Sequence, residues 1–463
     1  MSSKGNGSVD VHKYAKSESV KSGENSNARD GGGLAFFSPE LRDLRKQYFV
    51  IMARCIALVV LLMWATLPAY WGALSSQATR TQNLNAWFID RDGSRLGRAL
   101  WTAFGNTSTP GPQLGWTQVD PSSIGTDEAV SQAILDEQAW IAVVVEKNAT
   151  YNLWEARMHG DSSYNPASAI TVYYNQARNE IAAGNYLIPL TTALLQSSTS
   201  SFATNAAQLY MAYIHGGANG TVNATALALW AQAPLTMAPG VSWTEVNVRP
   251  FTAPVATAVT LVGQIYMCIF TFMLAQAHLT ARTLICKQLR FSSYLTLRLA
   301  TPLILYLPLS MSLSLVSLAF DLPFGARYPH AQGFMLFFTF IYLTMAALGL
   351  SLEAAVTVLG SRFTPLFLVG LIVYNVSPAA IPNQLQPPIF KYGAGFPMVN
   401  LAQAVRTIIF NTTSHLGVNA AVLLGWVLLS CITLSGLTWG VRWRERREEL
   451  RGRKGKELAK GES

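Results

Sequence analysis

The chain has 463 residues, of which 50% are hydrophobic and only 13% are charged. Soluble domains carry about 25% charged residues, so this composition indicates a membrane protein and the lipid bilayer as its main partner. The formal net charge is +9, but no RNA- or DNA-binding pattern accompanies it, and the basic residues lie beside apolar runs as topology signals do. We therefore expect no nucleic-acid partner.

The first 47 residues are rich in Ser, Gly, Asn and Lys and contain few apolar side chains. Such a segment buries too little surface to offset the entropy of ordering, so we expect residues 1–47 to be a disordered cytoplasmic tail. The apolar run at 48–74 follows, with Arg54 one turn inside it and Trp71 near its far end. Because Arg extends to the headgroups and Trp favours the interface, this run predicts the first transmembrane helix, which is also a signal anchor.

Residues 75–252 mix strand-like and helix-like patterns with turn signals. The expected strands are 85–90, 140–145, 170–174 and 243–248, and the expected helices are 95–104, 126–137, 176–198 and 202–214. The interleaving predicts an α/β or α+β domain of ordinary size. All four cysteines lie outside this segment, so we expect no disulfide in it.

Residues 253–441 contain five apolar runs separated by short polar joints. The runs are 253–277, 299–320, 333–352, 364–380 and 418–441. A helix needs about 20 mostly apolar residues to cross the hydrocarbon core, and only the run that ends in prolines falls short. The chain is thus predicted to be a multipass α-helical membrane protein, with six transmembrane helices and a large external α/β domain between helices 1 and 2. The alternative, buried helices in a large soluble core, is disfavoured because long uncharged runs seldom repeat so closely in soluble folds.

The positive-inside rule sets the expected orientation. The loop at 280–298 carries Arg282, Lys287, Arg290 and Arg298 without an acid, so it is predicted to be cytoplasmic. The basic tail at 442–463 then lies on the same side, so both termini are cytoplasmic. The tail is either a solvated stop-transfer segment or a binder of anionic lipid headgroups.

Five Asn-X-Ser/Thr sequons fall in segments that this topology places outside. They begin at Asn106, Asn148, Asn219, Asn223 and Asn411, and we expect at least two of them to be glycosylated. The topology implies a membrane of the secretory route. We expect the plasma membrane, with another secretory-pathway membrane as the alternative.

No catalytic pattern is found in the sequence. The six histidines are scattered without metal-ligand spacing, and neither G-x-S-x-G nor a phosphate-binding G-x-x-x-x-G-K-[ST] loop occurs. We therefore expect no enzyme activity, no metal, no cofactor and no ATP binding by this chain. An external enzyme is the least favoured function.

Three polar residues in or at the end of the apolar runs are candidates for a functional role, because polar groups are costly in a membrane. Gln264 and Asn375 either line a substrate path or join helices by hydrogen bonds. Glu353 lies at the inner end of its run and is expected to be interfacial, paired with Arg362.

The segment 383–410 differs from the other joints. Prolines end the preceding run, and Pro397 then opens a short helical pattern in which Gln403 and Arg406 are interspersed among apolar residues. This pattern predicts an external amphipathic or re-entrant helix against the membrane before the last transmembrane helix.

The arrangement of one helix, a large external domain and five further helices resembles the membrane subunits of ABC-2-type transporters, particularly the YhgE/Pip-like proteins. The segments that carry this resemblance are 85–98 (NAWFIDRDGSRLGR), 129–145 (AVSQAILDEQAWIAVVV) and 396–410 (FPMVNLAQAVRTIIF). In contrast to complete ABC exporters, this chain contains no ATPase motif.

More closely, the chain resembles the fungal nitrosoguanidine-resistance family of membrane proteins. The segments 140–153 (WIAVVVEKNATYNL) and 170–185 (ITVYYNQARNEIAAGN) carry this likeness, which extends over about residues 45–445. The resemblance implies a fungal multipass protein linked to resistance to toxic compounds, and it supplies no catalytic residues.

The expected function is therefore that of a transporter-like protein, promoting resistance to toxic small molecules by export or exclusion. Gln264 and Asn375 would offer a path between leaflets, and alanine at both positions should abolish resistance. The alternative is a non-transport organiser of membrane lipids, or a scaffold for other membrane proteins through the external domain. The substrate is a small molecule or a lipid, and a homo-oligomer is an open alternative.

Overall fold

The computed structural model of the chain describes residues 36–105, 111–216, 220, 222–286 and 288–461. Most of the expected tail at 1–47 and the sequons at Asn106 and Asn219 therefore lie outside the described residues. The chain forms two compact units, one up to Leu61 and the other from Leu62 onward.

The first long helix, α1, runs from Arg42 to Leu74 and is preceded by a 3-10 turn at Pro39–Leu41. It begins six residues before the start that the apolar run predicts, so the tail prediction is wrong for 42–47. These residues are good helix formers, and Asp43 and Lys46 form an ion pair of 3.7 Å at i,i+3 spacing. Most apolar side chains of α1 are exposed, which suits a helix that contacts lipid.

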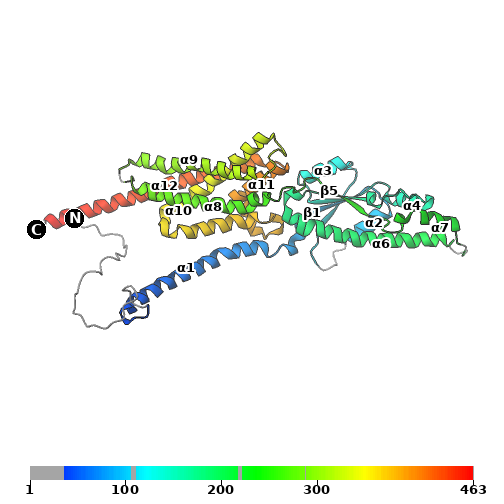
Figure 1. Ribbon diagram of the computed structural model, residues 1–463, viewed down its shortest axis with the longest axis horizontal. Helices are drawn as coiled ribbons and strands as arrows, with labels where there is room; N and C mark the ends of the chain where they lie inside the picture. Colours follow the sequence, from blue (N-terminus) through cyan, green and yellow to red (C-terminus); the bar gives the residue numbers. More distant parts are fainter. Residues whose placement is uncertain (1–35, 106–110, 217–219, 221, 287, 462–463) are drawn as a thin grey trace, which may run out of the picture. The chain divides into compact units, whose positions relative to one another are not determined.

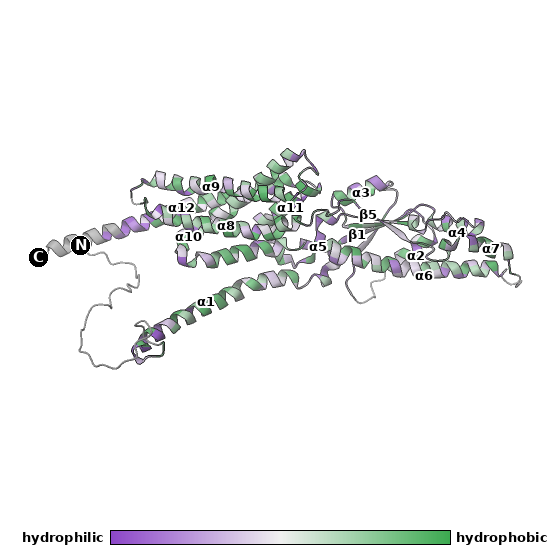
Figure 2. Ribbon diagram, in the orientation of Figure 1, coloured by the Kyte–Doolittle hydropathy of each residue, from purple (hydrophilic) through white to green (hydrophobic). Residues whose placement is uncertain are grey.

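Five helices of the described residues are long and apolar enough to cross a membrane. The first is α1, and the others are α8 Gly263–Thr283, which extends a π-helical turn at Ala258–Val262, α9 Phe291–Ala319, α10 His330–Ala379 and α12 Leu416–Gly461. Figure 2 shows apolar residues along these helices and hydrophilic residues toward the C-terminal end of α12. We call residues 258–448 the helical block.

The fourth and fifth predicted transmembrane helices are joined in α10. Its 50 residues would extend about 75 Å if straight, more than twice a hydrocarbon core of about 30 Å. Gly360 interrupts it with φ +68° and ψ 174°, a conformation that glycine adopts without strain. The polar joint at 361–363, which the sequence predicts as a loop, continues directly into the second helical segment.

The helix α10 is the centre of the helical block, where it packs against α8, α9, α11 and α12 (Figure 1). The short helix α11, Pro397–Phe410, starts at the proline that the sequence predicts. Twelve of its 14 residues are buried, including Leu401 and Ile408 in the core of the block. Neighbouring helices cover nearly all its faces, so α11 is not an amphipathic helix on the surface of the block, and the re-entrant alternative stays a prediction.

Between α1 and α8 lies a five-stranded mixed sheet of order β2-β1-β3-β4-β5. Its strands are β1 Asn85–Asp90, β2 Gly115–Val119, β3 Ile141–Val145, β4 Ile170–Tyr174 and β5 Trp243–Asn247. Neighbouring strands are parallel except β3 and β4, in which Ile141 lies opposite Tyr174. All side chains of β3 are buried, as its unbroken apolar sequence predicts for a central strand.

Helices cover both faces of this sheet. They are α2 Arg95–Phe104, α3 Asp127–Leu135, α4 Ala149–His159, α5 Glu180–Ala182, α6 Ile188–Ile214 and α7 Ala224–Gln232. Side chains of α2, α4 and α6 share a core with Phe88 and Val143 of the strands, whereas α3 packs on the other face with Ile89 and Val144. We call residues 85–247 the sheet domain.

The sequence prediction differs from the sheet domain in two places. The predicted helices 176–198 and 202–214 are not separate: after short irregular turns, one helix, α6, runs through both. The elements β2, α4 and α7 were not predicted.

Candidate functional site: an ion cluster within the helical block

Glu353 of α10 is fully buried, and so are its neighbours Leu352 and Ala354. A carboxylate in such a place needs compensating charge, because transferring it from water without a partner is very costly. Three cationic or basic side chains supply this: His278 and Arg282 from α8, and Arg298 from α9. We call these four residues the ion cluster.

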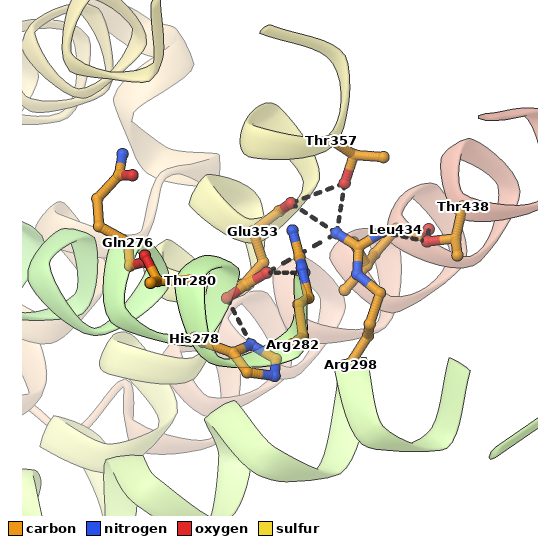
Figure 3. A network of polar contacts seen from close by, with 9 residues as sticks. All are labelled: Gln276, His278, Thr280, Arg282, Arg298, Glu353, Thr357, Leu434 and Thr438. Atoms are coloured by element: carbon orange, nitrogen blue, oxygen red, sulfur yellow. Dashed lines mark hydrogen bonds and ion pairs between the residues drawn. The ribbon is translucent and has the colours of Figure 1, made fainter. Parts of the chain in front are cut away.

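Both carboxylate oxygens of Glu353 are engaged (Figure 3). Nδ1 of His278 lies 2.9 Å from Oε1, and Nη1 of Arg282 donates to Oε2 at 3.0 Å. Nη2 of Arg298 is 3.8 Å from the same Oε2. One carboxylate thereby links α10 to both α8 and α9.

Arg298 extends the network to a fourth helix. Its Nη1 donates to Oγ1 of Thr438 on α12 at 2.7 Å, and its Nη2 donates to Oγ1 of Thr357 at 2.5 Å and to the backbone carbonyl of Glu353 at 3.2 Å. Figure 3 shows the guanidinium group of Arg298 between these partners. Four helices of the block are thus connected through two buried side chains.

The ion cluster has a net positive charge. Two arginines and one glutamate give +1 when His278 is neutral and +2 when it is protonated. Nε of Arg298, Nε2 of His278 and the hydroxyl of nearby Tyr306 are buried without a hydrogen-bond partner among the described residues. A buried polar network with unused donors is costly, so the arrangement favours a role other than stability.

The position of Glu353 corrects the sequence prediction. Its partners are not Arg362 but residues of α8 and α9, and its side chain is buried among helices; its interfacial depth stays a prediction. His278 and Arg282 were missed as site residues, although their i,i+4 spacing places both on one face of a helix. That shared face was the available signal, but nothing local indicates which carboxylate it meets.

Gln264 and Asn375 are both buried but do not belong to the ion cluster. Nε2 of Gln264 donates to the carbonyl of Thr260 at 2.7 Å, and Nδ2 of Asn375 donates to that of Leu371 at 2.9 Å. Each amide is therefore bonded within its own helix, and its oxygen has no partner among the described residues. The hydrogen bonds between helices that the sequence allowed are not formed by these side chains in the described part of the chain.

Arg406 of α11 connects the helical block to the sheet domain. Its Nη1 donates to Oε2 of Glu180 at 2.5 Å and to the carbonyl of Ala177 at 3.1 Å. Gln403, one turn earlier, lines a small cavity at the same junction. Pro397 occupies the first turn of α11, where its missing N–H costs no helical hydrogen bond.

Three glycosylation candidates lie in the described residues. Asn148 and Asn223 are exposed, each directly before a helix. Asn411 is half-buried, and its side-chain oxygen accepts a hydrogen bond from Arg327 at 3.2 Å. The first two positions are thus the more accessible.

Comparison with known proteins identifies a family and a yeast relative. The uncharacterized endoplasmic reticulum membrane protein YJR015W of Saccharomyces cerevisiae is 21% identical over 429 residues, which cover 86% of this chain and 82% of that protein. No solved structure matches the chain. The family model described as "Protein of unknown function (DUF3533)" matches residues 55–432. The long apolar helices and the membrane protein that the chain resembles together show a multipass membrane protein. The chain belongs to the DUF3533 family.

Proposed function

We propose that this membrane protein is transporter-like and promotes resistance to toxic small molecules by export or exclusion, with the ion cluster as its working element. The observation that carries the proposal is a fully buried carboxylate, Glu353, held by basic side chains of two other helices. Ionisable groups inside a membrane are rare, face the bundle interior, and mark substrate or proton paths.

The ion cluster is suited to hold the helices in one arrangement and release them in another. Glu353 is the common partner of α8 and α9, so neutralising it removes the attraction that joins both to α10. Interfaces that rearrange through such discrete contacts are a recurrent basis of conformational switching. In this proposal the path lies along the ion cluster, and Gln264 and Asn375 do not form it.

The proposed topology has six crossings, with α10 reversing at Gly360 on the cytoplasmic side. Both termini are then cytoplasmic and the sheet domain is external. Arg282 and Arg298 flank the loop between α8 and α9, which favours the cytoplasmic side for that end of the block. For the membrane itself we propose the plasma membrane. The name of the yeast relative makes the endoplasmic reticulum the alternative.

A second function, an organiser of membrane lipids, is favoured by a different observation. Arg282, Arg298 and Arg442 line one cavity between helices of the block, as expected of a site for lipid headgroups. In this alternative, resistance follows from an altered bilayer. If the chain instead serves as a scaffold for other membrane proteins through the sheet domain, deleting residues 80–245 should abolish function while the helical block still inserts.

The test is compound accumulation in cells that lack the protein and receive wild-type chain, Glu353→Gln or the control Glu448→Gln. Glu448 is an exposed glutamate of α12, so the control makes the same chemical change outside the ion cluster. We expect Glu353→Gln, compared at matched membrane abundance, to accumulate a fluorescent drug like cells without the protein, and Glu448→Gln to match wild type. Normal efflux in Glu353→Gln cells would overturn the proposal.

Two further measurements separate the alternatives. A labelled phospholipid is followed in the same cells, and a shift in its leaflet distribution that precedes drug entry would favour the lipid organiser. Loss of function by misfolding is controlled with Glu353→Gln/Arg282→Gln, which retains the +1 charge of the ion cluster because one acid and one base are removed together. A folded but inactive double variant supports a working role for these groups.

A further inference from the structure

A cavity of about 160 Å³ lies between α8, α9, α10 and α12, directly beside the ion cluster. Its polar lining includes Arg282, Arg298 and Arg442, with Tyr294 and Thr357. A single buried water molecule needs a cavity of roughly 10–15 Å³, so this cavity has room for a group larger than water. Because four helices contribute, the cavity is a feature of the packed block and not of a loop.

The three arginines outnumber the nearby acids. Glu445 is the one acid among the described lining residues, and Glu353 pairs with Arg282, so three arginines are accompanied by two carboxylates. Arg442 is half-buried, donates to the carbonyl of Cys286 at 2.9 Å, and lies over the ring of Tyr294 at 4.5 Å. Its guanidinium group is therefore held in place without a carboxylate partner among the described residues.

One arginine donor beside this cavity has no partner among the described residues. A guanidinium group has five N–H donors. The side chain of Arg298 is only 2% exposed, and its Nε is buried without a hydrogen-bond partner among the described residues. A tetrahedral oxyanion matches this arrangement, because phosphate oxygens accept paired hydrogen bonds from arginine.

The surroundings of the cavity are apolar. Leu279, Val356 and Val441 line it together with the basic residues. Leu284 and Val358, which follow lining residues in sequence, are 81% and 62% exposed. Such exposed apolar side chains at the end of membrane-spanning helices suit contact with acyl chains. The ligand is thus expected to be anionic at one end and apolar at the other.

We propose that this cavity binds the phosphate group of an anionic phospholipid, with Arg282, Arg298 and Arg442 as donors and the acyl chains along the adjoining apolar surface. Basic pockets between transmembrane helices bind anionic headgroups in this way. A phosphatidylcholine headgroup fits poorly, because its choline cation would face three guanidinium groups. The inference concerns lipid binding and holds whether or not the chain exports compounds.

The experiment uses the purified full-length chain in detergent, with the thermal unfolding midpoint measured against ligand concentration. The ligands are short-chain phosphatidic acid, short-chain phosphatidylcholine and inorganic phosphate. A ligand that binds the folded state raises the midpoint in proportion to its saturation. We expect phosphatidic acid to raise it, and the other two ligands to have little effect at equal concentration.

Matched variants locate the binding site. Arg442→Gln should weaken the apparent affinity for phosphatidic acid at least about tenfold, the usual consequence of losing one hydrogen bond to a charged group. Arg444→Gln makes the same change at an exposed residue of α12 outside the cavity and should behave like wild type. Glu445→Gln should strengthen binding, because it removes an opposing charge from the cavity rim.

Three outcomes would overturn the inference. Equal midpoint shifts with phosphatidic acid and phosphatidylcholine would show that the cavity does not distinguish lipids by headgroup charge. Equal losses in Arg444→Gln and Arg442→Gln would show that binding depends on general basicity. A full shift with inorganic phosphate would assign the cavity to a soluble phosphate compound. If Arg442→Gln does not fold, unchanged affinity in Glu445→Gln contradicts the inference.

Discussion

The ion cluster makes a quantitative prediction for Glu353→Gln. Two arginines and one glutamate give +1 in the wild type, and removing the carboxylate leaves +2 in a buried site. Breaking a buried ion pair by removing one partner costs about 3–5 kcal/mol, since the remaining charges are desolvated and unpaired. We expect this loss in the free energy of unfolding, seen as a thermal midpoint lowered by several degrees.

Arg282→Gln should lower the free energy of unfolding by less than Glu353→Gln does. That variant keeps Glu353 beside Arg298 and His278. The charges of Glu353 and Arg298 then sum to zero when His278 is neutral. In Glu353→Gln/Arg282→Gln the charge returns to +1, as one acid and one base are removed. The double variant should therefore be less destabilised than the two single losses added together, by about 2–3 kcal/mol of coupling.

The assay is a double-mutant cycle on the purified chain in one detergent, with unfolding followed by intrinsic fluorescence and by loss of the monodisperse elution peak. Arg362→Gln is the matched control for Arg282→Gln, because no ion pair of Arg362 occurs in the described part of the chain. The coupling energy between Arg362→Gln and Glu353→Gln should be no more than a few tenths of a kcal/mol. Additive losses in the main cycle would refute the assignment of Arg282 as a partner of Glu353.

Three other predictions concern the sheet domain and its contact with the block. Arg406→Met should lower the free energy of unfolding by about 2 kcal/mol, because Glu180 loses its hydrogen bond to a charged group; thermal unfolding checks this. Gly97→Ala should cost about 1–3 kcal/mol by the same measurement, because the added Cβ would lie 2.1 Å from the carboxylate of Asp90. Asn148→Gln should remove one endoglycosidase-sensitive step in apparent mass, since this exposed sequon is proposed to face outward.

Two of these predictions have a control in the chain. Gly184→Ala adds a Cβ with no atom within 4 Å and should leave unfolding nearly unchanged, so an equal loss at both glycines would contradict the steric argument. Asn375 also begins an Asn-X-Ser sequence, but it is buried in α10, so Asn375→Gln should not change the glycosylated mass. For Arg406, an unchanged midpoint in the methionine variant would mean that its ion pair contributes nothing measurable.

The strands show how much of the sheet domain could be predicted from the sequence. The bounds of β1 and β4 agree with prediction, and those of β3 and β5 differ by one residue each, because apolar and β-branched runs mark buried strands. The edge strand β2 (GWTQV) has no buried residue and hence no apolar pattern to reveal it. Its place beside β1 is set by tertiary pairing alone.

The interior of α6 misled the prediction for a different physical reason. Its serine- and threonine-rich stretch at 197–201 has the composition of a loop. In the folded chain Oγ of Ser198 donates to the carbonyl of Leu194 at 2.7 Å, and Oγ1 of Thr199 donates to that of Leu195 at 2.7 Å. These hydroxyl groups are satisfied by the preceding helical turn, so the helix continues.

The ion cluster could not be predicted at all. The partners of Glu353 are 55 to 75 positions away in sequence, and only the packing of α8 and α9 against α10 brings them together. Locally the glutamate is indistinguishable from a residue at the end of a transmembrane run. Basic residues near the ends of apolar runs are usually interpreted as topology signals. That interpretation gives no indication that Arg282 and Arg298 are buried.

Gly360 divides α10 into two segments with different partners. Glu353 clamps the segment of α10 before Gly360, whereas the segment after it contacts α1 through Tyr374, whose hydroxyl donates to the carbonyl of Ala65 at 2.9 Å. The α11 helix packs against α10 and carries Arg406, which binds the sheet domain. Since a glycine with positive φ separates these contacts, the two segments of α10 need not move as one rod. Arg406 is one of several contacts with the sheet domain: Thr413 also donates to the carbonyl of Leu135, and Ile381 and Leu385 pack into the core of the sheet domain. In the described part of the chain the ion cluster contacts α10 before Gly360, at Glu353 and Thr357.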